Sequence, residues 1–254
     1  MRLIVTDDHA EMSRVAGRLI ETAIQLNPTA ALVVATGNTP LQAYQELAQL
    51  VQQDQVDVSQ LRPFQLDEYL HVPATDPRSL FGWSKRAFLD PLQLPVEHMV
   101  RLRGDVADIP GACHSYDKAV EATGGFDLAI LGLGPNGHLG FNEPPTEADA
   151  PTRQVTLTQT SLTSNAGYWD KLEVPTRALT CGMRHLLAAR QILLLVSGSH
   201  KRDILWQTIN GPVTSAVPSS YLQQVSNALV IADRSAWPYP VSPAKIAQEQ
   251  DNER

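Results

Sequence analysis

The sequence has few cysteines, no long apolar run and no leader-like N-terminus. Its two cysteines, Cys113 and Cys181, lie far apart and lack metal-ligand spacing, so we expect two unpaired thiols in a reducing compartment. No stretch approaches the roughly 20 apolar residues of a membrane-spanning helix. The N-terminus also lacks the charged-then-apolar pattern of a signal peptide. These absences predict a soluble, cytoplasmic protein.

An excess of positive charge is absent as well, since the formal net charge is -7. A general nucleic-acid partner or an acidic membrane surface would need a basic field, so both are disfavoured as partners. A local phosphate site is not excluded, because it requires only a few groups. With 254 residues, 43% of them hydrophobic, the chain is long enough to bury a large core.

Short apolar runs alternate with amphipathic segments along the chain. The strand-like runs are residues 2–5, 30–35, 64–69, 126–133, 178–183, 191–196 and 227–233. Alternation of this kind predicts a mostly parallel sheet with helices on both faces, a three-layer αβα Rossmann-like α/β fold. We expect one domain over residues 1–243, followed by a loose polar tail over residues 244–254.

The run from Phe126 to Pro144 is the most informative stretch. It begins as a buried strand and ends in a tight loop that carries Asn136, His138 and Glu143. A histidine and a carboxylate just beyond the carboxyl end of a central strand lie where open α/β sheets bind ligands. The run therefore predicts a catalytic or binding site.

Two other strands lead through a glycine turn into a helix. Thr36-Gly37-Asn38-Thr39-Pro40 follows the first, with Thr39 suited to the N-cap and Pro40 to the first helical position. Ser197-Gly198-Ser199-His200-Lys201 follows the second and puts a lysine in the first helical turn. Helix N-termini favour anions. Taken by itself, the first turn is equally consistent with a plain connection and with a phosphate site. Lys201 in the second is a better phosphate candidate than an arbitrary surface lysine, because a cation there is unfavourable to the helix dipole unless an anion lies between them, although a surface lysine is the usual interpretation.

A pair of acids, Asp67 and Glu68, closes the apolar run 64–69. Adjacent side chains of a strand point to opposite faces, so the two carboxylates are not expected to share a role. We expect one to face a cleft and the other to hold a loop. Solvated surface acids are the ordinary alternative.

Four of these stretches together resemble the glucosamine-6-phosphate deaminase family, which includes galactosamine-6-phosphate deaminase/isomerase relatives. They are Ala35–Pro40, Leu66–Tyr69, Leu131–Pro144 and Val196–Lys201, in the family's order, and the similarity runs from about Ile4 to Asp233. The ending Asn136-Gly137-His138-Leu139-Gly140-Phe141-Asn142-Glu143-Pro144 is the specific part of the resemblance.

The resemblance implies a cofactor-independent, metal-independent isomerisation that converts an amino-sugar 6-phosphate to a ketose 6-phosphate and ammonia. His138 would open the sugar ring, with Glu143 orienting it and Asn136 beside it, because imidazole titrates near neutral pH. Asp67 would move the proton between C2 and C1. The phosphate contacts that the resemblance implies are Thr36, Gly37, Asn38, Thr39, Gly137 and Lys201.

The chain departs from the family at Gly167, where many relatives carry a phosphate-binding arginine. Arg153, which resembles a lid arginine of the family, is the nearest candidate to compensate, ahead of Lys85, Arg86 and Arg184. Asn136 stands where some relatives carry aspartate, so ring opening would depend more on Glu143.

Two other functions stay open on the sequence. A 6-phosphogluconolactonase-type hydrolase shares the fold, but Tyr69 after the acid pair and the presence of Glu143 favour the deaminase. A sugar-phosphate sensor without turnover is the third reading, because of Gly167. Glucosamine and galactosamine 6-phosphates, the oligomeric state (a homo-oligomer included) and an allosteric site are likewise left open.

Overall fold

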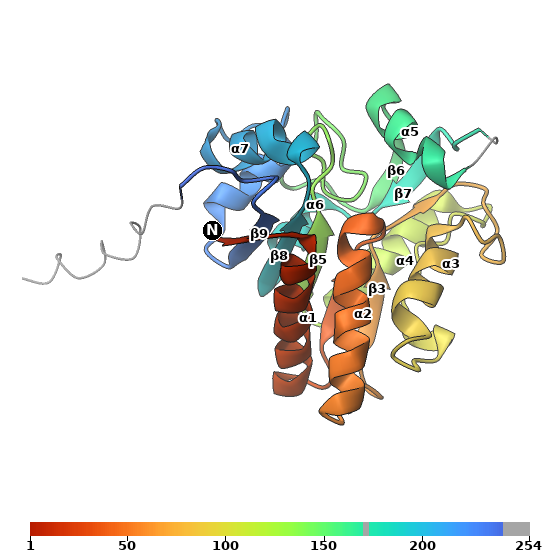
Figure 1. Ribbon diagram of the computed structural model, residues 1–254. Helices are drawn as coiled ribbons and strands as arrows, with labels where there is room; N and C mark the ends of the chain where they lie inside the picture. Colours follow the sequence, from red (N-terminus) through yellow and green to blue (C-terminus); the bar gives the residue numbers. More distant parts are fainter. Residues whose placement is uncertain (170–172, 241–254) are drawn as a thin grey trace, which may run out of the picture.

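A six-stranded parallel sheet forms the centre of the computed structural model, which describes residues 1–169 and 173–240 (Figure 1). In spatial order its strands are β1 (Arg2–Thr6), β9 (Ala228–Asp233), β8 (Gln191–Val196), β5 (Leu128–Gly132), β2 (Ala31–Val34) and β3 (Arg62–Gln65). All neighbouring pairs are parallel. The inner strands are almost wholly apolar because both faces of the sheet are covered.

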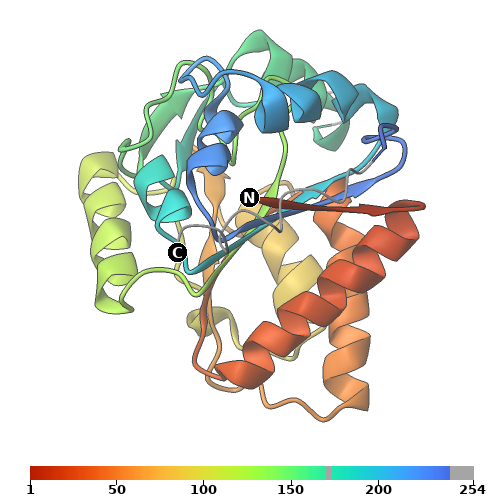
Figure 2. The ribbon, with the colours of Figure 1, turned by 90° about the vertical axis from the view of Figure 1, so that its left-hand side faces the viewer.

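Helices cover the two faces and create a separate core on each side. Figure 2 shows α4 to one side of the sheet and α1 and α2 to the other. The first face carries α1 (His9–Leu26), α2 (Asn38–Gln53), α3 (Leu80–Ser84) and the π-helix η1 (Lys85–Leu89). The second carries α4 (Ile109–Ala122), α6 (Met183–Leu187), α7 (Arg202–Asn210) and the 3-10 helix η5 (Pro218–Gln224).

The alternation of side chains along β2 illustrates how the two cores form. Leu32 and Val34 pack into the core beneath α1 and α2, whereas Ala31 and Val33 pack into the core beneath α4 and α6. Both cysteines are free and buried in the second core. The predicted three-layer α/β fold with a parallel sheet is therefore confirmed.

A second, antiparallel sheet of three strands corrects one prediction. Its strands are β4 (Asp67–Tyr69), β7 (Arg177–Thr180) and β6 (Arg153–Thr156), and it carries α5 (Gln159–Asn165) and η3 (Ala166–Tyr168). The run 64–69 is not one strand. It leaves the main sheet at Gln65, which pairs with Val34, and joins the small sheet at Asp67, which pairs with Thr180.

Residues 99–102, whose sequence pattern favours a short strand, instead contribute a single bridge, between Val100 and Phe64, beside the 3-10 helix η2 (Val96–His98). The predicted tail 244–254 lies outside the described residues. Within residues 1–169 and 173–240, no helix has both the length and the apolarity needed to cross a membrane.

Candidate active site

A cavity of about 580 Å³ lies at the carboxyl ends of the parallel strands, where α/β sheets bind their ligands. The loops after β2, β5 and β8 line it together with β4, α3–η1 and the segment 164–168. Among the residues singled out from the sequence, it brings together Thr36, Gly37, Asn38, Thr39, Asp67, His138 and Lys201. These residues come from four separate stretches of chain, so the fold itself assembles the site.

The loop after β2 presents backbone N–H groups to the cavity. Helix α2 begins at Asn38 with Gly37 as its N-cap, so the predicted N-cap at Thr39 is wrong. Gly37 has φ of 105°, a conformation that glycine adopts easily, and no side chain in the described residues caps the helix. The first N–H groups of α2 are therefore available to an anion.

The loop after β8 has a similar form. Gly198, with φ of 95°, begins a 3-10 turn, η4 (Ser199–Lys201), that continues directly into α7. Asp233 at the end of β9 fixes this turn, because it accepts hydrogen bonds from the Gly198 N–H and the Ser197 hydroxyl. Lys201 lines the cavity, and burial lowers its pKa. It makes no ion pair in the part of the chain that the structure describes.

Asp67 and Glu68 face different surroundings, as the strand alternation predicts. Glu68 is buried, and each of its oxygens accepts two hydrogen bonds. The donors are Gln65 Nε2 at 2.8 Å and the N–H groups of Tyr69, Leu80 and Phe81 at 2.9 Å. Asp67 lines the cavity, and its Oδ1 has no hydrogen-bond partner among the described residues. Burial, followed by the charge of Glu68, raises the pKa of Asp67 to about 8.

The loop after β5 holds His138 against the cavity with Glu143 behind it. His138 Nδ1 is buried, lies 3.7 Å from Glu143 Oε2 and has no hydrogen-bond partner within the described residues. Glu143 Oε2 also accepts a hydrogen bond from Asn136 Nδ2 at 2.8 Å. A side chain at Gly134 would overlap the imidazole ring, so this close approach requires glycine.

Glu143 is held in its charged form. Burial by itself would raise its pKa, but the polar groups around it, beginning with His138 and including Thr158 and Asn136, hold the pKa well below its ordinary value. A buried carboxylate that stays ionised beside an imidazole can orient the ring and stabilise its protonated form. Neither Glu143 nor Asn136 lines the cavity directly.

Two residues predicted to contact phosphate lie elsewhere. Gly137 accepts the N–H of Ser219 through its carbonyl, and its Cα faces Val217 and Ile204 rather than the cavity. Arg153 does not line the cavity either. Its guanidinium donates to Asn142 Oδ1 at 2.8 Å and to Thr146 Oγ1 at 3.0 Å, which fixes the chain on both sides of Glu143.

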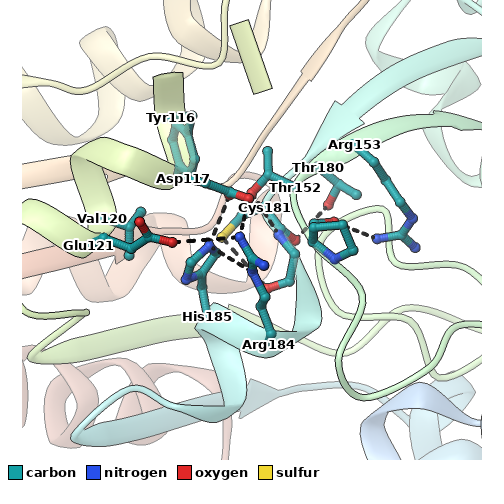
Figure 3. Close-up of polar contacts among 12 residues, drawn as sticks. Tyr116, Asp117, Val120, Glu121, Thr152, Arg153, Thr180, Cys181, Arg184 and His185 are labelled. Atoms are coloured by element: carbon teal, nitrogen blue, oxygen red, sulfur yellow. Dashed lines mark hydrogen bonds and ion pairs between the residues drawn. The ribbon is translucent and has the colours of Figure 1, made fainter. Parts of the chain in front are cut away.

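The weaker cationic candidates divide into two groups. Arg184 forms an ion pair with Asp117 on α4, and His185 Nε2 lies 2.9 Å from the same carboxylate (Figure 3). Lys85 pairs with Asp90 on the surface at 2.6 Å. Arg86, by contrast, lines the cavity. These contacts leave Arg86 as the candidate that the structure brings to the site.

Arg78 and Tyr168 are polar residues of the cavity wall that the sequence did not indicate. Arg78 pairs with Asp76 and lies over the ring of Trp169, with 4.9 Å from its central carbon to the ring centroid. Tyr168 places its hydroxyl 3.9 Å from the position that a Cβ on Gly37 would occupy. No local pattern identifies either residue, because each reaches the cavity through contacts between distant segments. Space around the position where a Gly167 side chain would begin is open.

No three His, Cys, Asp or Glu side chains in residues 1–169 and 173–240 are placed to share a metal ion. The fold and the cavity define a Rossmann-like α/β protein with a small-molecule site at the carboxyl edge of its sheet. The chain belongs to the family described as glucosamine-6-phosphate isomerases/6-phosphogluconolactonase, whose sequence profile matches residues 7–231.

Individual relatives narrow this assignment. The chain is 40% identical to a glucosamine-6-phosphate deaminase of Streptomyces avermitilis, over 93% of this chain and 91% of the relative. It is 35% identical to the enzyme of that name from Halothermothrix orenii, over 93% and 98%. A solved monomeric glucosamine-6-phosphate deaminase superposes with a TM-score of 0.90 at 31% identity, covering 93% and 98% of the two chains.

The other branch of the family shares the fold. A 6-phosphogluconolactonase from Trypanosoma cruzi superposes with a TM-score of 0.74 at 21% identity, over 95% of this chain and 97% of that one. At this identity the likeness concerns the fold alone.

Proposed function

We propose that this protein is a glucosamine-6-phosphate deaminase, which converts glucosamine 6-phosphate to the ketose 6-phosphate and ammonia. The observation that carries the proposal is the shared cavity, in which Asp67 and His138 face the same space as Lys201 and the N-terminus of α2. The relatives that carry this name match the chain over nearly its full length.

Phosphate binding is assigned to the loop 36–39 and to Lys201. The N–H groups at the start of α2 and the helix dipole favour a dianion. Lys201 lies in the first helical turn after Gly198, where a cation interacts unfavourably with the helix dipole unless an anion lies between them. An ammonium group whose pKa burial has lowered is stabilised in its charged form by such an anion.

Ring opening is assigned to His138 with Glu143 behind it. The reaction needs a proton to move between the anomeric hydroxyl and the ring oxygen. Nδ1 of His138 faces Glu143, which leaves Nε2 as the nitrogen that reaches the substrate. The ionised Glu143 stabilises the imidazolium that forms when His138 takes the proton. Asn136 contributes by donating to the same carboxylate oxygen.

Isomerisation is assigned to Asp67. Its carboxylate removes the proton from C2 of the open-chain amino sugar and returns it to C1, while a proton passes from the amine nitrogen to the C1 oxygen. The aldehyde thereby becomes an alcohol, and C2 becomes an imine that water hydrolyses to ketone and ammonia. Because the pKa of Asp67 is raised to about 8, its ionised form is a stronger base than the carboxylate of an ordinary aspartate. Glu68 holds the first turn of α3 and takes no part in proton transfer.

A kinetic comparison tests the proposal. The purified protein is assayed for ammonia and ketose 6-phosphate with glucosamine 6-phosphate and, side by side, with galactosamine 6-phosphate. We expect a higher kcat/KM for the glucosamine epimer. A preference for galactosamine 6-phosphate would change the substrate but not the reaction class.

Two outcomes would reject the reaction itself. Hydrolysis of 6-phosphogluconolactone without amino-sugar turnover would assign the protein to the lactonase branch. Thermal stabilisation by glucosamine 6-phosphate with no product would assign a sensor.

A further inference from the structure

Thr158 contacts both oxygens of the Glu143 carboxylate. Its hydroxyl donates to Oε2 at 2.6 Å, and its backbone N–H donates to Oε1 at 3.2 Å. Thr158 lies between α5 and β6, a strand of the small antiparallel sheet. Glu143, by contrast, lies in the loop after β5 of the six-stranded sheet. Hydrogen bonds to an ionised group are stronger than neutral ones and specify its orientation.

The contact matters because few other hydrogen bonds orient the Glu143 carboxylate. Within the described residues, Asn136 is the other side chain that donates a hydrogen bond to it. His138 Nδ1 lies 3.7 Å away, beyond hydrogen-bond distance, although it is buried and has no partner there. Closing this gap to a hydrogen bond takes a movement of roughly 1 Å. The movement succeeds only if the carboxylate oxygen stays aimed at the imidazole.

We propose that Thr158 is a positioning residue, which aims Glu143 Oε2 at His138 for ring opening. This inference rests on the proposed function. The same threonine is the N-cap of α5, where its hydroxyl oxygen accepts the N–H of Ser161 at 3.3 Å. Helix α5 continues through Ser164 and Asn165 into Gly167 and Tyr168, which line the cavity. Thr158 thereby joins the carboxylate behind His138 to the cavity wall formed by residues 164–168.

Two substitutions separate the hydroxyl from the rest of the side chain. Thr158→Val keeps the shape and the backbone N–H but removes the O–H donor, whereas Thr158→Ser keeps the donor. Loss of one hydrogen bond to a charged group predicts a fall in kcat of about 10- to 100-fold in Thr158→Val. Thr158→Ser retains kcat within about threefold, because the same bond forms. KM and stabilisation by inorganic phosphate stay within about threefold in both, since neither change touches the loop 36–39 or Lys201.

A cap variant elsewhere controls for helix fraying. Asp108 is the N-cap of α4 and accepts the N–H of Gly111 at 2.9 Å, so Asp108→Ala removes a cap away from the cavity. It should lower the melting temperature as Thr158→Val does and leave kcat unchanged.

Each outcome bears on the proposal. Unchanged kcat in Thr158→Val, failure of Thr158→Ser to rescue, or loss of phosphate binding parallel to kcat would overturn the positioning role. These results presuppose turnover by the unmodified protein. If the unmodified protein does not turn over glucosamine 6-phosphate, the proposed function itself fails. If it does, and only the Thr158 variants behave otherwise than expected, the positioning role alone fails.

Discussion

Asp67 and Glu68 are consecutive residues of β4, yet their carboxylates lie in opposite environments. Glu68 accepts four hydrogen bonds from the protein, whereas Asp67 Oδ1 accepts none from the described residues and faces the cavity. A buried carboxylate that the protein leaves unpaired is available to a substrate. One acid of the pair therefore maintains the structure while the other is free for chemistry.

Asp67→Asn removes the proposed base with little change in shape. We expect kcat to fall by about 100- to 10,000-fold, the usual contribution of a general base, with KM changed less than about threefold. NMR in deuterated buffer measures the exchange of the C2 hydrogen of the substrate, which should be lost. Exchange at the rate of the unmodified protein would exclude Asp67 as the base, and stabilisation by inorganic phosphate serves as the control for an intact site.

Glu68→Gln should affect folding rather than chemistry. The substitution replaces one carboxylate oxygen with an NH2 group. That group faces two N–H donors, which lose their acceptor, and an unsatisfied buried donor destabilises the fold. The expected loss of unfolding free energy is about 2–4 kcal/mol, measured by urea denaturation. Glu97→Gln provides the matched control, because Glu97 is exposed. Equal stabilities of the two variants would contradict the structural role of Glu68.

The raised pKa of Asp67 also predicts how stability depends on pH. The folded protein keeps the Asp67 proton up to about pH 8, whereas the unfolded chain releases it near pH 4. Between these values the unfolded state binds fewer protons, so this group's contribution to stability is lost as the pH rises.

Asp67→Asn lacks this titration. Its unfolding free energy relative to the unmodified protein should therefore increase between about pH 4 and pH 8, by up to about 1.4 kcal/mol for each pH unit. Urea denaturation of both proteins across this range measures the difference. Parallel pH dependences would show that Asp67 ionises normally in the folded protein.

The sequence predicts the layers of the fold, the edge of the sheet at which the cavity lies and the different surroundings of Asp67 and Glu68. These features follow from strand alternation and from glycine turns after apolar runs. It does not predict that the chain changes sheets at Leu66. That break depends on pairing between Asp67 and Thr180, a contact between distant segments that leaves no mark on the local apolar pattern.

The partners of charged side chains are likewise not predicted by the sequence. Arg153 and Arg78 look equivalent in the sequence, since each follows a proline-containing stretch. In the structure, Arg153 is bound by Asn142 and Thr146 behind Glu143, whereas Arg78 reaches the cavity by lying over Trp169. Which partner a long side chain finds is decided by segments that only the fold brings together.

Lys201→Met tests the phosphate assignment by removing the ammonium group while keeping an apolar stem. We expect KM for glucosamine 6-phosphate to rise about 10- to 100-fold, with a smaller change in kcat, since a bond between two charged groups is lost far from the reacting carbons. Lys85→Met makes the same charge change at the surface, where Lys85 pairs with Asp90, and should leave KM unchanged. Thermal stabilisation by inorganic phosphate should disappear in Lys201→Met and persist in Lys85→Met. If both variants keep the KM of the unmodified protein, the phosphate is bound by the loop 36–39 without Lys201, and burial of this lysine needs another explanation.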